Sequence, residues 1–189
     1  MAAHGPMRDP MTQDAPEVTK ALVLGAGAGS RLKNSTPKPL LPLMGVPLLA
    51  RTLFTLRRAG ITDAYVVLGH QGERVRREIE AIRRLDLRIH WIENPRWEEP
   101  NGVSVLAGAT HLDEPFILTM SDHLLEVEAI ARLRREAARG HDLVLLVDRG
   151  TDQVHDLSDT TKVKLDGERI TGIGKELLDF DAIDTGAFL

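Results

Sequence analysis

The segment Ala21-Leu22-Val23-Leu24-Gly25-Ala26-Gly27-Ala28-Gly29-Ser30-Arg31-Leu32 decides how the rest of the sequence is interpreted. Its four consecutive apolar residues predict a strand that is buried on both faces, as in a parallel sheet covered by helices. The glycines that follow let main-chain N–H groups approach a ligand closely, and successive N–H groups form an anion-binding nest. The segment therefore predicts an α/β chain that binds an anionic ligand at the end of its first strand.

Strands and helices alternate along the chain beyond this segment. Apolar runs predict further strands over 64–68, 87–92, 115–120 and 142–147, and apolar residues at helical spacing predict helices over 47–59, 73–84 and 127–139. After about Gly150 the alternation ends, and residues 162–170 predict a hairpin around Asp166-Gly167. We therefore expect an α/β fold with a Rossmann-like, mostly parallel sheet flanked by helices and a small antiparallel insert near the C-terminus.

The composition excludes several classes of protein. The chain has 189 residues, a formal net charge of −4 and no cysteine. An acidic chain is a poor candidate for bulk nucleic-acid binding, and the lack of cysteine excludes disulfides, iron–sulfur clusters and a cysteine nucleophile. No apolar window approaches the roughly 20 residues of a membrane-spanning helix. We expect a cytoplasmic domain over 20–189 that contacts neither nucleic acid nor membrane, preceded by a flexible tail over 1–19.

The distribution of charge predicts the kind of anion. From Val18 to Thr62 there is no Asp or Glu, whereas Lys and Arg recur at Lys20, Arg31, Lys33, Lys38, Arg51, Arg57 and Arg58. A window that has several cations and no acid is suited to binding a polyphosphate. A phosphate P-loop would require Gly-Lys-Ser/Thr, and a dinucleotide loop would require an acid about 20 residues further on, and neither is present. The remaining alternative is a glycine-rich turn with incidental cations.

A carboxylate follows the predicted strand over 115–120, in the sequence Met120-Ser121-Asp122-His123. The carboxyl ends of parallel strands are where α/β sheets bind ligands, so Asp122 is a candidate ligand-binding residue. The alternative is that Asp122 caps the turn that follows.

The glycine-rich segment together with Pro37-Lys38-Pro39-Leu40 resembles the signature of the sugar-phosphate nucleotidyltransferases, and the resemblance extends from about Lys20 to the last residue. It implies that Arg31 and Lys38 are catalytic, because in that family they hold the reacting phosphates. It implies a Mg²⁺ cofactor on Asp122, whose shell substrate phosphates would complete. The residues implied to bind the nucleoside triphosphate here are Leu24, Gly25, Ala26, Gly27, Gly29, Ser30, Arg31 and Lys38. A second acidic metal ligand of the family has no match before Leu189.

Weaker matches extend the predicted site. The resemblance implies nucleotide contacts by Gln71, Asn101, Gly102 and Ser104, although Asn101 and Ser104 equally suit a helix N-cap. For the acceptor substrate it implies His123, Lys175, Asp184, Thr185 and Gly186. His123 alternatively packs in a turn, and Lys175 is alternatively a solvated lysine.

Within the family, three short segments are most similar to the inositol-1-phosphate cytidylyltransferases: residues 120–123, 174–176 and 184–189. This likeness implies transfer of CMP from CTP to inositol-1-phosphate. Such enzymes are often fused to a membrane-embedded transferase domain, and the chain ends in a predicted strand, so we expect a C-terminally truncated piece of a longer protein. The alternatives are a choline-phosphate cytidylyltransferase, a hexose-1-phosphate enzyme using UTP or dTTP, a non-catalytic nucleotide-binding domain and, third, a Rossmann oxidoreductase.

Overall fold

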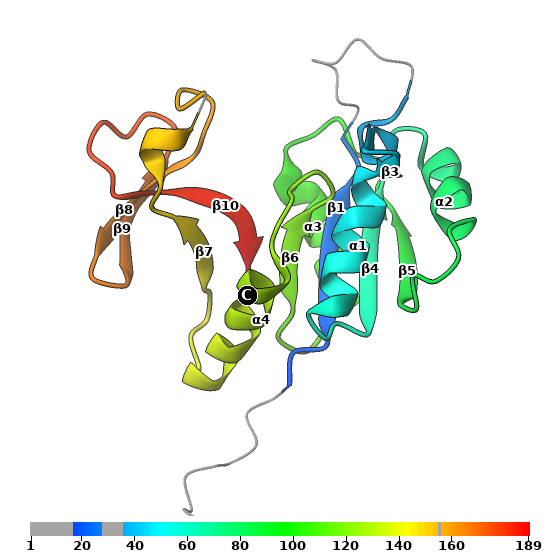
Figure 1. Cartoon of the computed structure of the whole chain (residues 1–189), viewed down its shortest axis with the longest axis horizontal. Coiled ribbons are helices and arrows are strands. Elements are labelled where there is room, and N and C mark those ends of the chain that lie inside the picture. The colour runs from blue at the N-terminus through cyan, green and yellow to red at the C-terminus, as the bar shows by residue number, and fades with distance from the viewer. Residues whose placement is uncertain (1–16, 28–35, 155) are drawn as a thin grey trace, which may run out of the picture.

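A computed structural model describes residues 17–27, 36–154 and 156–189 (Figure 1). Within these residues eight strands form one sheet, in the order β5-β4-β1-β6-β10-β8-β9, with β7 paired to β10. Its parallel part consists of β1 (Lys20–Gly25), β4 (Asp63–Leu68), β5 (Arg88–Glu93) and β6 (Ile117–Met120). The parallel, helix-flanked sheet expected from the apolar runs is confirmed.

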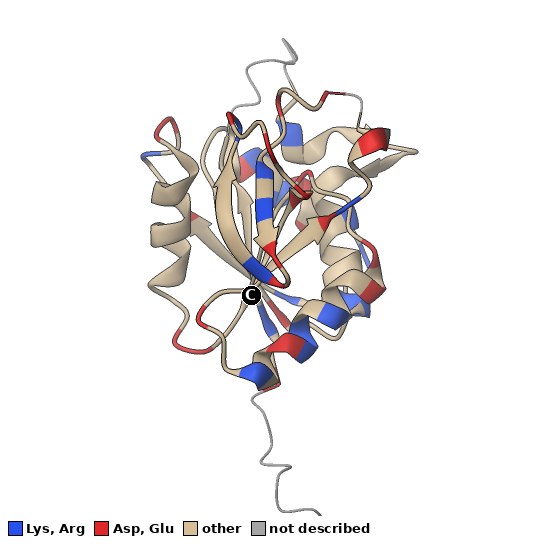
Figure 2. Ribbon diagram, turned by 90° about the vertical axis from the view of Figure 1, so that its left-hand side faces the viewer, with Lys and Arg blue, Asp and Glu red and all other residues tan. Residues whose placement is uncertain are grey.

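Helices cover both faces of the parallel strands. On one face α1 (Leu48–Arg58), α2 (Gly72–Glu80) and α4 (Val127–Glu136) pack against the larger core cluster, and α3 (Asn101–Ala109) lies on the other face (Figures 1 and 2). Strand β1 serves both cores, because Ala21 and Val23 point to the first face and Leu22 and Leu24 to the second. Gly108 allows close packing of α3, since a Cβ there would lie 2.2 Å from Leu22 Cδ1.

The largest differences from the predicted boundaries are the end of one helix and the start of one strand. The helix expected over 73–84 ends at Glu80, and in the turn that follows Arg84 and Asp86 adopt the left-handed region with φ of 76° and 52°. This turn brings Leu85 into the core. The helix expected over 127–139 is confirmed: it is α-helical to Glu136 and continues as a 3₁₀ turn, Ala137–Arg139, which Gly140 ends with a φ of 68°. The strand expected over 142–147 starts at Leu145.

The C-terminal part is antiparallel. Strands β7 (Leu145–Asp148), β8 (Lys162–Asp166), β9 (Arg169–Gly174) and β10 (Ala182–Phe188) follow one another, with a short 3₁₀ turn, Thr151–Gln153, after β7. The predicted hairpin is confirmed as β8 and β9. Because β10 runs antiparallel to β6, its first residues lie at the edge where β6 ends.

A second small sheet stands between the glycine-rich segment and α1. It consists of β2 (Pro42–Leu43) and β3 (Val46–Pro47), preceded by the 3₁₀ turn η2 (Lys38–Leu40). Among the described residues, no helix has the length and apolarity that crossing a bilayer requires.

Candidate active site

The carboxyl ends of β1, β4, β5 and β6 share one edge of the sheet. The helices α2 and α3 are the next elements after β4 and β5, so their N-termini lie toward this edge as well. The exposed N–H groups and positive dipole ends of helix N-termini favour anions. The topology by itself therefore suits a phosphate-bearing ligand at this edge.

Lys38 and Asp122 come together at this edge. Asp122 lies two residues after the end of β6. The intervening Ser121 is held to β1 by the bond from its N to Leu24 O of 2.9 Å, and the Thr52 hydroxyl donates to Ser121 O at 3.2 Å. Lys38 starts η2, which is anchored by the buried Pro39 and Leu40. The Lys38 ammonium forms an ion pair with the Asp122 carboxylate, and the side chains are 41% and 21% exposed. Both groups therefore remain accessible to a ligand.

The start of the glycine-rich segment is packed against the end of β4. The backbone of His70 donates to Ala26 O at 3.1 Å. A Cβ on Gly69 would lie 2.2 Å from Trp97 Cβ and 2.9 Å from Ala26 O, so this close approach requires glycine. The sequence analysis assigned no role to Trp97, because residue spacing does not reveal a contact between Gly69 and Trp97. Of the predicted loop residues, Gly29, Ser30 and Arg31 lie outside the described residues.

The other predicted nucleotide contacts fall into two groups. Gln71 is exposed at the start of α2, and Asn101 and Gly102 are exposed in the first turn of α3. Ser104 is buried, and its Oγ accepts a hydrogen bond of 2.9 Å from the amide of Asn94. The N-cap alternative for Asn101 and Ser104 is wrong, because Pro100 occupies the N-cap and no described side chain caps the helix.

Four predicted acceptor residues meet beside Asp122. The ring of His123 donates from Nδ1 to Thr185 O at 2.7 Å, and the Asp184 carboxylate accepts from Gly186 N at 2.6 Å. Lys175 lies apart from this group. It follows β9, which is separated from β10 by β8, a distance of about 10 Å between strands. The Lys175 ammonium donates to Asp159 at 2.7 Å.

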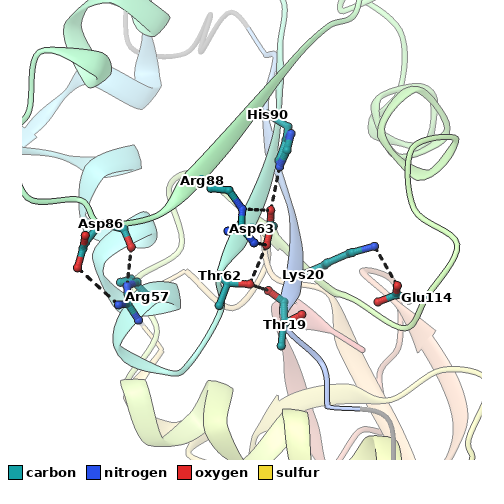
Figure 3. A network of polar contacts seen from close by, with 9 residues as sticks. All are labelled: Thr19, Lys20, Arg57, Thr62, Asp63, Asp86, Arg88, His90 and Glu114. Atoms are coloured by element: carbon teal, nitrogen blue, oxygen red, sulfur yellow. Dashed lines mark hydrogen bonds and ion pairs between the residues drawn. The ribbon is translucent and has the colours of Figure 1, made fainter.

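The cations of the acid-free window do not all face one ligand, which corrects the expectation that the whole window suits a polyphosphate. Lys20 pairs with Glu114 at 3.2 Å and Arg57 pairs with Asp86 at 3.6 Å, both at the amino ends of the strands (Figure 3). Arg51 donates to Leu43 O at 2.9 Å and supports the β2–β3 hairpin. The count was misleading because α1 carries Arg57 to the edge opposite Lys38.

The described residues contain no cluster of three or more His, Asp or Glu side chains that could hold a metal ion. Magnesium commonly binds through one or two carboxylates plus substrate phosphates and water. The accessible carboxylate of Asp122 fits this pattern.

Comparison with known proteins identifies the family. The MobA-like NTP transferase domain matches residues 21–162. The chain belongs to this family. Members with similar sequences include two proteins named bifunctional IPC transferase and DIPP synthase. The protein of Rubrobacter xylanophilus is 42% identical over 172 residues, which cover 89% of this chain and 38% of that protein. The protein of Archaeoglobus fulgidus is 32% identical over 174 residues, covering 92% and 33%. This NTP transferase domain thus spans well under half the length of these relatives.

Solved structures confirm the nucleotidyltransferase fold of this family. The inositol-1-phosphate CTP transferase from T. maritima matches with a TM-score of 0.77 and 23% identity, over 91% of this chain and 70% of that one. A UDP-glucose pyrophosphorylase complexed with UDP-glucose matches with a TM-score of 0.73 and 15% identity, over 90% and 75%. At these identities the likeness concerns the fold alone.

Proposed function

We propose that this domain transfers CMP from CTP to inositol-1-phosphate and releases pyrophosphate and CDP-inositol. The observation that carries the proposal is the convergence of Lys38 and Asp122 at the carboxyl edge of the sheet, with both side chains accessible. The relatives named IPC transferase favour this nucleotide and this acceptor, and the fold is one that an inositol-1-phosphate CTP transferase shares. The proposal includes a cytoplasmic location, where nucleoside triphosphates are available.

In the proposed reaction a phosphate oxygen of inositol-1-phosphate attacks the α-phosphorus of CTP. The bond from that phosphorus to the oxygen bridging to the β-phosphate breaks, and pyrophosphate leaves with the electron pair. The acceptor phosphate is already ionised at neutral pH, so no strong general base is required. Catalysis then consists mainly of alignment and of neutralising phosphate charge.

The residues of the chain divide this work. Arg31 and the N–H groups of the glycine-rich segment hold the leaving pyrophosphate, and Lys38 neutralises charge at the α-phosphate. Asp122 would hold Mg²⁺, which supplies further neutralisation of phosphate charge when bound. Lys175 is assigned to the acceptor phosphate, and in that role its ammonium must leave Asp159 and reach toward residues 184–186. Because Lys38 and Asp122 pair with each other in the free protein, a nucleotide must separate them, so that each group finds its partner in the complex.

Calorimetric titration with CTP, UTP, ATP and GTP, each with and without Mg²⁺, tests the nucleotide. We expect the tightest binding for CTP with Mg²⁺, and we expect Asp122→Asn to abolish the gain from Mg²⁺. Pyrophosphate release is then measured with inositol-1-phosphate, choline phosphate and glucose-1-phosphate as acceptors. Preference for UTP and glucose-1-phosphate would contradict the proposal in favour of a hexose-phosphate enzyme. Nucleotide binding without pyrophosphate release from any acceptor would favour a non-catalytic domain.

A further inference from the structure

A hydrogen bond joins the two halves of the candidate site. His123 directly follows Asp122 at the end of β6, and Thr185 lies 62 positions further on, in β10. The distance from His123 Nδ1 to Thr185 O is 2.7 Å. A carbonyl oxygen only accepts hydrogen bonds, so His123 Nδ1 is the donor in this contact. The contact thereby connects the end of β6 to the predicted acceptor segment.

The surroundings of this bond are shaped to hold it. A Cβ on Gly186 would lie 2.0 Å from His123 Nδ1, and Gly186 has a φ of 73°, so glycine is required for both space and backbone conformation. The Thr185 hydroxyl donates to Leu146 O on β7 at 2.7 Å. The pairing of β10 with β7 also shifts register between Asp184 and Phe188. Thr185 is therefore held through its carbonyl by His123, which follows β6, and through its hydroxyl by β7.

We propose that His123 is a positioning residue for the acceptor. Through Nδ1 it holds the Thr185 carbonyl and keeps residues 184–186 in place beside Asp122, so that the acceptor phosphate is presented to the nucleotide at a set distance. This inference rests on the proposed function and gives His123 a role that does not involve contact between Nε2 and the substrate. It predicts a defect in the use of the acceptor, with nucleotide binding spared.

Substitution of His123 by Asn or by Gln distinguishes the roles of its two ring nitrogens. The side-chain nitrogen of Asn reaches the position of Nδ1, whereas that of Gln reaches the position of Nε2, and both side chains are neutral. We expect the KM for inositol-1-phosphate to be about tenfold higher in His123→Gln than in His123→Asn, the effect of about one hydrogen bond, with equal KM for CTP. His141→Gln is the control, because His141 is exposed in the loop before β7. A higher acceptor KM in the Asn variant, or equal values in both, would overturn the inference.

Hydrogen exchange of the substrate-free chain provides a readout that does not depend on the reaction. Amides over 182–188 are expected to exchange faster in His123→Gln than in His123→Asn, because the Gln variant releases the Thr185 carbonyl. Equal exchange in the two variants would overturn the inference. If the wild-type chain shows no transfer to inositol-1-phosphate, the proposed function fails, and this measurement still decides whether His123 holds the segment.

Discussion

The two edges of the parallel sheet treat their carboxylates in opposite ways. At the amino edge Asp63 is 13% exposed and accepts two hydrogen bonds from Arg88, at 2.8 and 2.6 Å, and further ones from Thr62 and His90 (Figure 3). At the carboxyl edge Asp122 has a single charged partner among the described residues, Lys38, and more exposure. The carboxylate oxygens of Asp63 are occupied by hydrogen bonds from the protein, whereas those of Asp122 retain lone pairs for other ligands.

Electrostatics at the amino edge agrees with this difference. The bidentate Arg88 guanidinium, aided by His90 and Thr62, holds the pKa of the Asp63 carboxyl well below its ordinary value. Lys20 and Arg57, which also lie at this edge, are paired with acids. We infer that the charged side chains at the amino edge stabilise the fold, and that Lys38 and Asp122 at the carboxyl edge serve ligand binding and the reaction. Substitutions at the two edges should therefore affect different measurements.

The largest effect is expected for Lys38→Ala. Loss of one preorganised group that stabilises charge in the transition state lowers turnover by roughly 10²–10³. The measurement is pyrophosphate release at saturating CTP and inositol-1-phosphate. Lys20→Ala is the matched control, since Lys20 belongs to the same acid-free stretch but lies at the other edge, and its turnover should equal that of the wild type. Wild-type turnover in Lys38→Ala would contradict the role assigned to Lys38.

Asp63→Asn tests the amino edge. The substitution removes the charge that Arg88 and His90 contact, and it should lower the free energy of unfolding by about 1–3 kcal/mol without changing turnover. Urea unfolding at pH 7 measures the first quantity. Asp113→Asn serves as the control, because the Asp113 side chain is 90% exposed and its ion pair with Lys20 should contribute little. A loss of turnover in Asp63→Asn with unchanged stability would reverse the comparison between the edges.

The advantage of wild type over Asp63→Asn should depend on pH. The folded-state pKa of Asp63 is lowered, so its contribution to stability is complete above the unfolded-state pKa of about 3.9 and is lost as the pH falls through the lower folded-state value. The difference in unfolding free energy between the two proteins should therefore shrink by about 1 kcal/mol between pH 7 and pH 3. Urea unfolding of both proteins at each pH provides the measurement, and a difference that stays constant would show that the ionised carboxylate is not responsible.

The sequence predicted β1 and β4 well because these two strands pack into the core on both faces. Uninterrupted apolar runs such as Ala21–Leu24 and Ala64–Leu68 are typical of strands that helices cover from both sides. The end of α2 was predicted less well. Residues 81–84 continue the helical pattern of apolar spacing, and that pattern does not show the turn with left-handed Arg84 and Asp86 that places Leu85 in the core.

In the candidate site, too, some features were predictable from the sequence and others were not. Lys38 and Asp122 were predicted separately, from a motif and from the end of a strand, and the structure brings them into contact. Contacts between distant segments, such as His123 with Thr185 or Gly69 with Trp97, leave no periodic signal in one sequence. Ser104 shows the opposite case, in which a residue within a plausible motif is buried against Asn94.

The smallest effect is expected for a metal ion bound in the absence of nucleotide. If Asp122 is the metal ligand, the Lys38 ammonium competes with the ion for the same carboxylate in the free protein. Replacing Lys38 by the uncharged side chain in Lys38→Met should strengthen the binding of Mn²⁺, used as a probe in place of Mg²⁺, by about two- to fivefold, because a partly exposed ion pair contributes little. Water-proton relaxation during a Mn²⁺ titration measures this affinity, and Lys20→Met is the control. Weaker binding in Lys38→Met would show that the ion binds elsewhere. Stronger binding would mean that Lys38 acts as a stand-in cation, which keeps the carboxyl edge neutral until a nucleotide and its metal ion arrive together.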